Sequence, residues 1–165
     1  MKNFQEFLNK LLSSPSSKTK FSIRGELKRL KGMARFRTVN MPNDEYIKIT
    51  FFDGSFLLIM PNDEEIYYAD EVVEHIKEIK DKDIGTKKLI SYKGKEYQLE
   101  NRDDYQFVIN RHVGSHNDIE GEARFSDYFP TSGPQEFLSL GWLSYTGKRA
   151  DINPVIIDLS EVELL

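Results

Sequence analysis

GEARFSDYFPTSGPQEFLSLGW, residues 121–142, contains the only tryptophan of the chain and two runs that are rich in phenylalanine. Over residues 120–125, charged and apolar side chains alternate, which is the pattern of a strand with one buried face. The alternation breaks at residues 127–130 and resumes over residues 135–145, so we expect a loop between two strands. Because loops that carry large aromatic side chains beside charged groups are typical binding surfaces, we place a candidate binding site here.

The candidate binding residues combine aromatic area with charge in and around this loop. They are Arg124, Asp127, Tyr128, Phe129, Trp142 and Arg149. Trp142 falls on the same strand face as Leu138 and Leu140, which predicts a largely buried indole. Arg149 follows a turn glycine, Gly147, and the cations there could hold an anion, although a solvated hairpin end explains the same sequence.

The composition is that of an ordinary globular protein. The chain has 165 residues, 39% of them hydrophobic and 30% charged, which suits one domain or one domain with an appendage. The absence of cysteine excludes disulfides, zinc–thiolate sites and cysteine nucleophiles. No apolar run approaches the roughly 18 to 20 residues of a membrane-spanning helix, and no signal-peptide pattern is present, so we expect a cytoplasmic protein.

Charge is distributed unevenly along the chain. Residues 1–40 contain ten Lys and Arg and two acidic residues, a net charge of +8; because the whole chain carries −4, the remainder carries −12. Such a division predicts a basic segment that meets an anionic surface or folds back onto an acidic body. Nucleic acid is not an expected partner, because the remainder would repel a polyanion and no nucleic-acid-binding motif is present.

An amphipathic helix is predicted over residues 3–12, because apolar residues recur there with a helical period and Asn3 can cap the start. The Ser- and Pro-rich residues 13–17 then form a linker. We therefore divide the chain into an N-terminal helix with its linker, residues 1–17, and a single mainly-β domain, residues 18–165. The apolar stripe of so short a helix needs a covering surface, which can be the body of the protein, a partner protein or a lipid interface.

Two further helices are expected. A basic helix is predicted over residues 23–31, where Ile23, Leu27 and Leu30 share one helical face. Residues 70–80 also show a helical apolar period, with acidic residues early and lysines late, which matches the helix dipole.

The sequence Met-Pro-Asn-Asp-Glu occurs at residues 41–45 and again at residues 60–64. Proline, asparagine and aspartate favour turns, and each copy lies between runs that are typical of strands. Asp53-Gly54 is a strong hairpin signal between the second and third of these runs. We expect a four-stranded antiparallel meander whose third strand, residues 56–60, is apolar on both faces and the most buried.

The second half returns to strands, with tight turns expected at Lys93-Gly94 and Thr146-Gly147. Strands are predicted over residues 89–92, 96–99, 105–110, 120–125, 136–145 and 155–159. The fold class is therefore α+β and mainly antiparallel β, with two meanders that form a curled or packed sheet and two to three short helices.

Imidazole and carboxylate side chains gather in RHVGSHNDIEGE, residues 111–122. His112, His116 and Asp118 are the candidate metal ligands, because neutral His and ionised Asp bind divalent ions. The spacing matches no metal motif, and Gly114-Ser115 favours a loop, so a solvated polar loop explains the same residues. We expect no bound cofactor.

Catalytic signatures are missing from the chain, which has neither GxSxG nor a phosphate-binding glycine loop. We therefore expect a non-enzymatic binding or adaptor module that interacts with another protein through residues 127–142 or the N-terminal helix. The alternative is a peripheral membrane protein that binds an anionic membrane surface through its N-terminal helix and basic segment. A third hypothesis is a metal-dependent enzyme that acts through the His112–Glu122 loop.

Overall fold

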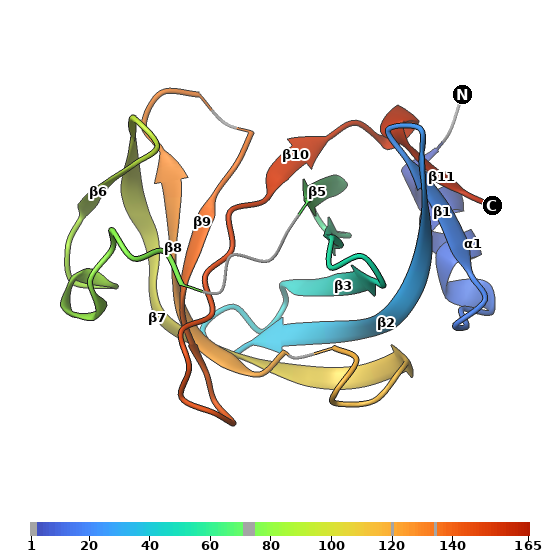
Figure 1. Cartoon of the computed structure of the whole chain (residues 1–165), viewed down its shortest axis with the longest axis horizontal. Coiled ribbons are helices and arrows are strands. Elements are labelled where there is room, and N and C mark those ends of the chain that lie inside the picture. The colour runs from blue at the N-terminus through green and yellow to red at the C-terminus, as the bar shows by residue number, and fades with distance from the viewer. Residues whose placement is uncertain (1–2, 71–74, 120, 134) are drawn as a thin grey trace.

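The computed structural model describes residues 3–70, 75–119, 121–133 and 135–165. These residues form a mainly antiparallel β-sheet that curls into a half-barrel, with one α-helix at the N-terminal end (Figure 1). The elements are α1 (Phe4–Ser13), β1 (Lys20–Ile23), β2 (Glu26–Thr38), β3 (Glu45–Phe51), β4 (Phe56–Met60), β5 (Glu65–Ala69), the 3₁₀ turn η1 (Asp81–Asp83), β6 (Leu89–Tyr92), β7 (Lys95–Val113), β8 (Ala123–Pro130), β9 (Leu138–Leu143), β10 (Val155–Ile157), the 3₁₀ turn η2 (Leu159–Glu161) and β11 (Val162–Leu164).

Two long strands, β2 and β7, join the halves of the sheet. The strand order is β10-β5-β4-β3-β2-β7-β8-β9, while β6 pairs with β7 and β1 pairs with both β2 and β11. The pairing of β2 with β7 shifts register between Met33 and Ala34 and again between Arg35 and Phe36. Such bulges bend strands and increase their twist, so the sheet curls along β2 and β7 (Figure 1).

The predicted meander is confirmed in the first half. β2 pairs with β3, and β3, β4 and β5 pair in sequence order. In the turn between β3 and β4, Gly54 has φ +90° and the Asp53 carboxylate accepts a 2.9 Å hydrogen bond from the Ser55 backbone N–H. Glycine adopts this φ at little cost, which explains the Asp-Gly sequence. Residues 56–59 of β4 are all buried, so both faces of this strand are covered.

The first half of the sheet buries its two faces against different partners. Ile47, Ile49 and Phe51 of β3 belong to a core cluster that also includes residues of α1, β1, β4 and β5. The intervening Tyr46 and Lys48 lie on the other face, because successive side chains of a strand alternate. This second face lines an interior cavity between β3–β5 and β8–β9.

α1 packs on the first of these faces. Phe7, Leu8 and Leu11 are buried in the core cluster, and Lys10 Nζ donates a 3.0 Å hydrogen bond to the Leu164 carbonyl. Of the three surfaces that could cover the apolar stripe, the body of the protein is the one observed. Across the described ranges, no helix has both the length and the apolar character to cross a membrane.

The basic helix predicted over residues 23–31 is wrong. The segment is a hairpin between β1 and β2, with Arg24 and Gly25 in the turn at φ +51° and +82°. Phe21 and Ile23 are buried with a period of two, and β1 pairs with β2 on one side and with the C-terminal β11 on the other. These strand pairings outweigh the local helical period.

The helix predicted over residues 70–80 is wrong where the structure describes it. Residues 71–74 lie outside the described residues, and residues 75–80 contain turns but no helix. The backbone N–H of Ile76 donates to the Asp151 carboxylate at 2.7 Å, which gives that N–H a partner outside any helix. The described residues therefore contain one α-helix, where the sequence indicated two to three.

The second half contains longer strands than the sequence predicted. β7 is a single 19-residue strand, because register shifts around Asn101 and Asp104 absorb the polar residues between the two predicted strands. β8 continues through residues 127–130, where we expected a loop. Pairing with β7 holds these four residues extended, and Asp127 and Tyr128 also pair with β9; no local pattern indicates these pairings.

The C-terminal segment spans the gap between the two ends of the sheet. Ser139 of β9 and Ile152 exchange backbone hydrogen bonds of 3.0 and 2.9 Å, and the Ala150 N–H donates to the Gly141 carbonyl at 2.8 Å. The chain then enters β10, which pairs with β5. The edges of β9 and β5 are therefore both covered, and strands enclose the space between them on several sides.

Candidate functional site

Two adjoining cavities, of about 250 and 430 Å³, lie between the halves of the sheet. The two cavities share part of their lining, which comes from β3, β4, β7, β8, β9 and the segment before β10. The shared residues are Tyr46, Leu58, Gln106, Phe125, Ser139 and Ile152. A concave site with mostly apolar walls and a few converging polar groups is the usual location of a bound ligand. This interior space is therefore the candidate functional site.

Alternation within the strands directs side chains into the cavities. On β8, every second residue contributes to the lining: Ala123, Phe125, Asp127 and Phe129. β9 approaches β8 closely at Gly141, where a Cβ would overlap the Arg124 backbone carbonyl. A glycine at this position permits the close approach of the two strands that form one wall of the site.

Five aromatic side chains line the smaller cavity: Tyr46, Tyr67, Phe125, Phe129 and Phe137. Tyr67 meets Phe137 edge to face with ring centroids 4.9 Å apart, and Phe129 stacks on Phe137 at 5.7 Å. These are favourable arrangements for aromatic pairs, so the rings support one another in the wall.

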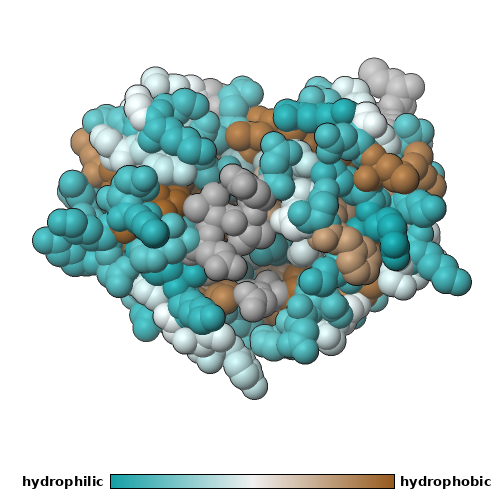
Figure 2. Space-filling model, in the orientation of Figure 1, coloured by the Kyte–Doolittle hydropathy of each residue, from teal (hydrophilic) through white to brown (hydrophobic). Residues whose placement is uncertain are grey.

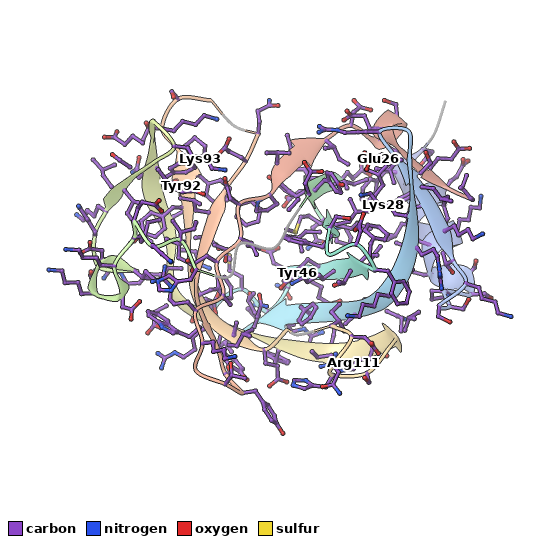
Figure 3. The ribbon with its side chains drawn as sticks, viewed as in Figure 1. Glu26, Lys28, Tyr46, Tyr92, Lys93 and Arg111 are labelled. Carbon is purple, nitrogen blue, oxygen red and sulfur yellow. The ribbon has the colours of Figure 1, made fainter. Side chains whose placement is uncertain are left out.

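Tyr46 lies near the centre of the molecule on β3 (Figure 3). Its hydroxyl donates a 2.5 Å hydrogen bond to Gln106 Oε1, and Gln106 Nε2 donates to the Gly121 carbonyl. Burial raises the pKa of Tyr46, and the negative charge of Asp127 adds to this effect. Tyr46 is therefore a neutral group that connects β3 to β7 across the interior.

Asp127 is half-buried and lines the smaller cavity. Its Oδ1 atom is buried and has no hydrogen-bond partner among the described residues. Burial raises the pKa of this carboxyl to about 7. Hydrogen bonds from Ser139 and Asn101 lower the pKa, whereas the charge of Asp104 raises it further, and the effect of burial is the largest. A carboxyl group that titrates near neutral pH inside a cavity is a typical functional group.

Replacing Asp127 with Asn should stabilise the protein at pH 8 but not at pH 4. The pKa of this carboxyl is about 7 in the folded state, against 3.8 for an ordinary aspartate. Between these values the folded state keeps a proton that the unfolded state has lost, so wild-type stability falls as the pH rises. Each pKa unit corresponds to about 1.4 kcal/mol, and hydration of the half-buried side chain should limit the gain to about 2 kcal/mol.

Urea denaturation of wild type and Asp127→Asn at the two pH values measures this difference. Asp103→Asn is the matched control, because Asp103 is exposed and its pairing with Arg124 is expected to contribute little. A stability gain for Asp127→Asn that is the same at pH 4 and pH 8 would contradict the assignment.

The two ends of the interior differ in charge. The lining of the smaller cavity includes five carboxyl groups, those of Asp44, Glu45, Asp63, Glu65 and Asp127. Among the described residues, no Lys, Arg or His lines this cavity. The lining of the larger cavity includes Lys48, His75, Lys148 and Arg149, with Asp151 as the carboxylate. Ligand groups of opposite charge would be drawn to opposite ends.

The acidic end is formed by the two copies of Met-Pro-Asn-Asp-Glu. The turns lie side by side, because Asn62 Nδ2 donates a 2.8 Å hydrogen bond to the Asn43 carbonyl. Each copy contributes an exposed aspartate to the lining, Asp44 from the first and Asp63 from the second. The repeated turn therefore concentrates negative charge beside the smaller cavity.

Arg149 lines the larger cavity, but its guanidinium is bound within the protein. It contacts Asp151 with two hydrogen bonds of 2.7 and 3.2 Å, Asp81 at 2.6 Å and the Ile79 carbonyl at 3.1 Å. The side chain of Arg149 is 6% exposed and that of Asp151 is fully buried. These contacts join the segment before β6 to the segment before β10, a structural role.

The structure separates the candidate binding residues that we named from the sequence. Asp127 and Phe129 lie together in the smaller cavity, and Arg149 lies in the larger one. Tyr128 and Trp142 lie on the opposite face of β8 and β9, where they pack in a second core cluster with Leu138 and Leu140.

Tyr128 and Arg124 have partners within the protein. The Tyr128 hydroxyl donates to the Lys87 carbonyl at 2.8 Å and accepts from the Gly85 N–H at 3.0 Å. Arg124 is exposed and forms two hydrogen bonds with Asp103. Neither side chain reaches the cavity.

The candidate metal ligands also have other contacts. Asp118 Oδ2 accepts hydrogen bonds from the Ser115 backbone N–H at 2.8 Å and hydroxyl at 3.1 Å, while His116 lies 3.4 Å from Arg111. Burial lowers the pKa of His112, whose Nε2 is enclosed and has no hydrogen-bond partner among the residues that the structure describes. Among the described residues, no group of three or more His, Asp or Glu side chains is arranged to hold a metal ion.

Most of the cavity lining was missed by sequence reasoning, including Tyr46, Tyr67, Gln106, Phe137 and Ser139. Alternation along β3 and β8 assigns each side chain to a face of its strand. Which of those faces meet depends on the curl at β2 and β7, and the sequence carries no local signal for it.

Known proteins supply no further guide to the site. No family model, curated protein or solved structure matches this chain. The geometry of the interior is therefore the basis for a functional proposal.

Proposed function

We propose that the protein is a non-catalytic binding module that takes its ligand into the cavity between the halves of its sheet. The observation that carries this proposal is an aromatic-lined interior space with a carboxyl group, Asp127, whose buried Oδ1 has no partner in the described part of the chain. A buried acceptor without a donor costs free energy, so a ligand that supplies a donor gains more here than at the surface.

The face of the molecule drawn in Figure 2 supports surface docking less well than the cavity supports ligand binding. Figure 2 shows mostly hydrophilic residues on the face in view, with hydrophobic residues in separate groups. Tyr128 and Trp142, two of the candidate binding residues, pack in the second core cluster. A partner protein would therefore engage the site by inserting a side chain or a chain end.

The membrane alternative also has less support than the cavity. Insertion into a lipid surface requires a free apolar face on the N-terminal helix. Phe7, Leu8 and Leu11 already cover the core cluster, so their release would expose the apolar surface that they bury.

A neutral fluorescent probe, N-phenyl-1-naphthylamine, tests the proposal. We expect saturable binding at one site with blue-shifted emission, because the probe enters an apolar interior. Ser139→Phe adds a ring to the lining shared by both cavities and should weaken binding by about tenfold or more, which corresponds to about 1.4 kcal/mol.

Ser91→Phe is the matched control, because Ser91 is exposed on β6 and lies outside the lining of both cavities. The urea unfolding of both variants must be as cooperative as that of the wild type before their affinities are compared. Probe binding that Ser139→Phe leaves unchanged would refute the cavity as the binding site.

A further inference from the structure

We infer that the smaller cavity recognises an organic ammonium group, which contacts Asp127 and the surrounding aromatic rings. This inference rests on the proposed function, since it names the ligand chemistry of the same cavity. Three features of the described residues support it: the charge of the lining, the unpaired oxygen of Asp127 and the arrangement of the rings.

The first feature is an excess of negative charge that the protein leaves uncompensated. Glu45 is paired with Arg37 at 2.5 Å and with Arg35 at 3.8 Å, so its charge is balanced. Asp44 and Asp63 contribute exposed carboxylates to the same lining, and no ion pair joins either to a described residue. Their field attracts cations toward the cavity and repels anions.

The second feature is the carboxyl of Asp127, which lies inside this acidic end. Its Oδ1 lacks a donor among the described residues, and hydrogen bonds from charged donors are about twice as strong as neutral ones. An ammonium group in the cavity would supply the opposite charge, and it would also supply the missing donor once the carboxyl turns its buried Oδ1 toward the cavity. A neutral hydroxyl would supply only the donor.

The third feature is the group of aromatic side chains around Asp127. Tyr67, Phe129 and Phe137 contact one another in the wall, and Tyr46 and Phe125 complete the lining. Ring faces attract organic cations and accept the alkyl groups attached to them. A lining of rings and one enclosed carboxyl therefore suits an alkylammonium group better than a strongly hydrated ion.

An inorganic cation fits this end less well. Calcium and magnesium need several oxygen ligands at short distances, and the described residues contain no such group of three or more side chains. The larger cavity is lined by Lys148, which no ion pair joins to a described residue, so its positive charge would keep a cation at the acidic end. The charge distribution therefore also sets the orientation of the ligand, with its ammonium group in the smaller cavity.

The same ammonium chemistry is carried by a free amine and by the lysine side chain of a partner protein. Two pairs of ligands separate these sources and isolate the contribution of charge. Hexylamine and 1-hexanol form the small-molecule pair, and the acetylated, amidated tripeptides Gly-Lys-Gly and Gly-Leu-Gly form the peptide pair.

Isothermal titration calorimetry of the full chain at pH 8 measures the four affinities. We expect hexylamine to bind about tenfold or more tightly than 1-hexanol, because a charged hydrogen bond and cation–π contacts add to the same alkyl burial. Asp127→Asn should remove this preference while 1-hexanol binding is retained. Asp103→Asn, a matched change at an exposed aspartate, should leave the preference intact.

The peptide pair then identifies the source of the ammonium group. Preference for Gly-Lys-Gly over Gly-Leu-Gly that depends on Asp127 supports a lysine of a partner protein, whereas binding of hexylamine alone supports a free amine. Equal affinity for hexylamine and 1-hexanol, or a preference that survives Asp127→Asn, would overturn the inference and leave cavity binding standing. If neither compound binds and N-phenyl-1-naphthylamine does not bind either, the proposed function itself fails.

Discussion

Arg149→Met should lower the free energy of unfolding by about 3 to 5 kcal/mol, because it leaves a fully buried carboxylate without its cation. Asp151 accepts two hydrogen bonds from Arg149 and one from the Ile76 backbone N–H. After the substitution, the Ile76 N–H is the one of these three donors to Asp151 that remains. The loss should lower the melting temperature by roughly 10 °C for a domain of this size.

Arg124→Met provides the matched control in urea denaturation. Arg124 also forms a close ion pair, with Asp103, but both side chains are more than half exposed. Exposed pairs of this kind contribute about 1 kcal/mol or less. If Arg149→Met cost no more than Arg124→Met, the contacts of Arg149 would not be what holds the segments before β6 and β10 together.

Deletion of residues 1–17 should cost about 5 kcal/mol of folding free energy. α1 contributes Phe7, Leu8 and Leu11 to the largest core cluster, and burial of each such side chain stabilises a fold by about 1.5 to 3 kcal/mol. The truncated protein would leave the facing residues of β1 and β11 open to water. Thermal unfolding followed by circular dichroism measures the change.

Two triple-alanine variants separate the buried face of α1 from the helix itself. Replacing Phe7, Leu8 and Leu11 together should reproduce most of the stability loss caused by the deletion. Replacing Gln5, Glu6 and Asn9 on the exposed face should lower the stability only slightly. A truncated chain that melts at the wild-type temperature would show that the helix is an arm and that residues 18–165 are complete without it.

Prediction from the sequence succeeded where the signals are local. The turns at Asp53-Gly54 and Lys93-Gly94 lie where expected, since both positions require backbone angles that glycine adopts easily. Alternation correctly placed Ala123 and Phe125 on one face of β8 and Arg124 on the other. It also indicated β4 as the most buried strand of the meander.

The errors arise where distant segments meet. Residues 23–31 have a helical period, yet they pair as β1 and β2 because β11 supplies the neighbouring strand from the other end of the chain. Residues 127–130 have the composition of a loop, yet all four pair with β7, the first two also pair with β9, and the segment remains extended. In each case the free energy of strand pairing and burial exceeds the local preference.

The sequence by itself determined β3, β4 and β5, the turns between them and the alternation of residues 123–125 in β8, because turn chemistry and alternation operate over a few neighbouring residues. It also singled out Asp127 and Phe129 as candidate binding residues. Only the tertiary structure decided that these two side chains meet Tyr46, Tyr67 and Phe137 around one cavity. That meeting depends on the bulges that curl β2 and β7 and on the closure of the sheet by the C-terminal segment, and both are set by pairings between residues far apart in the chain.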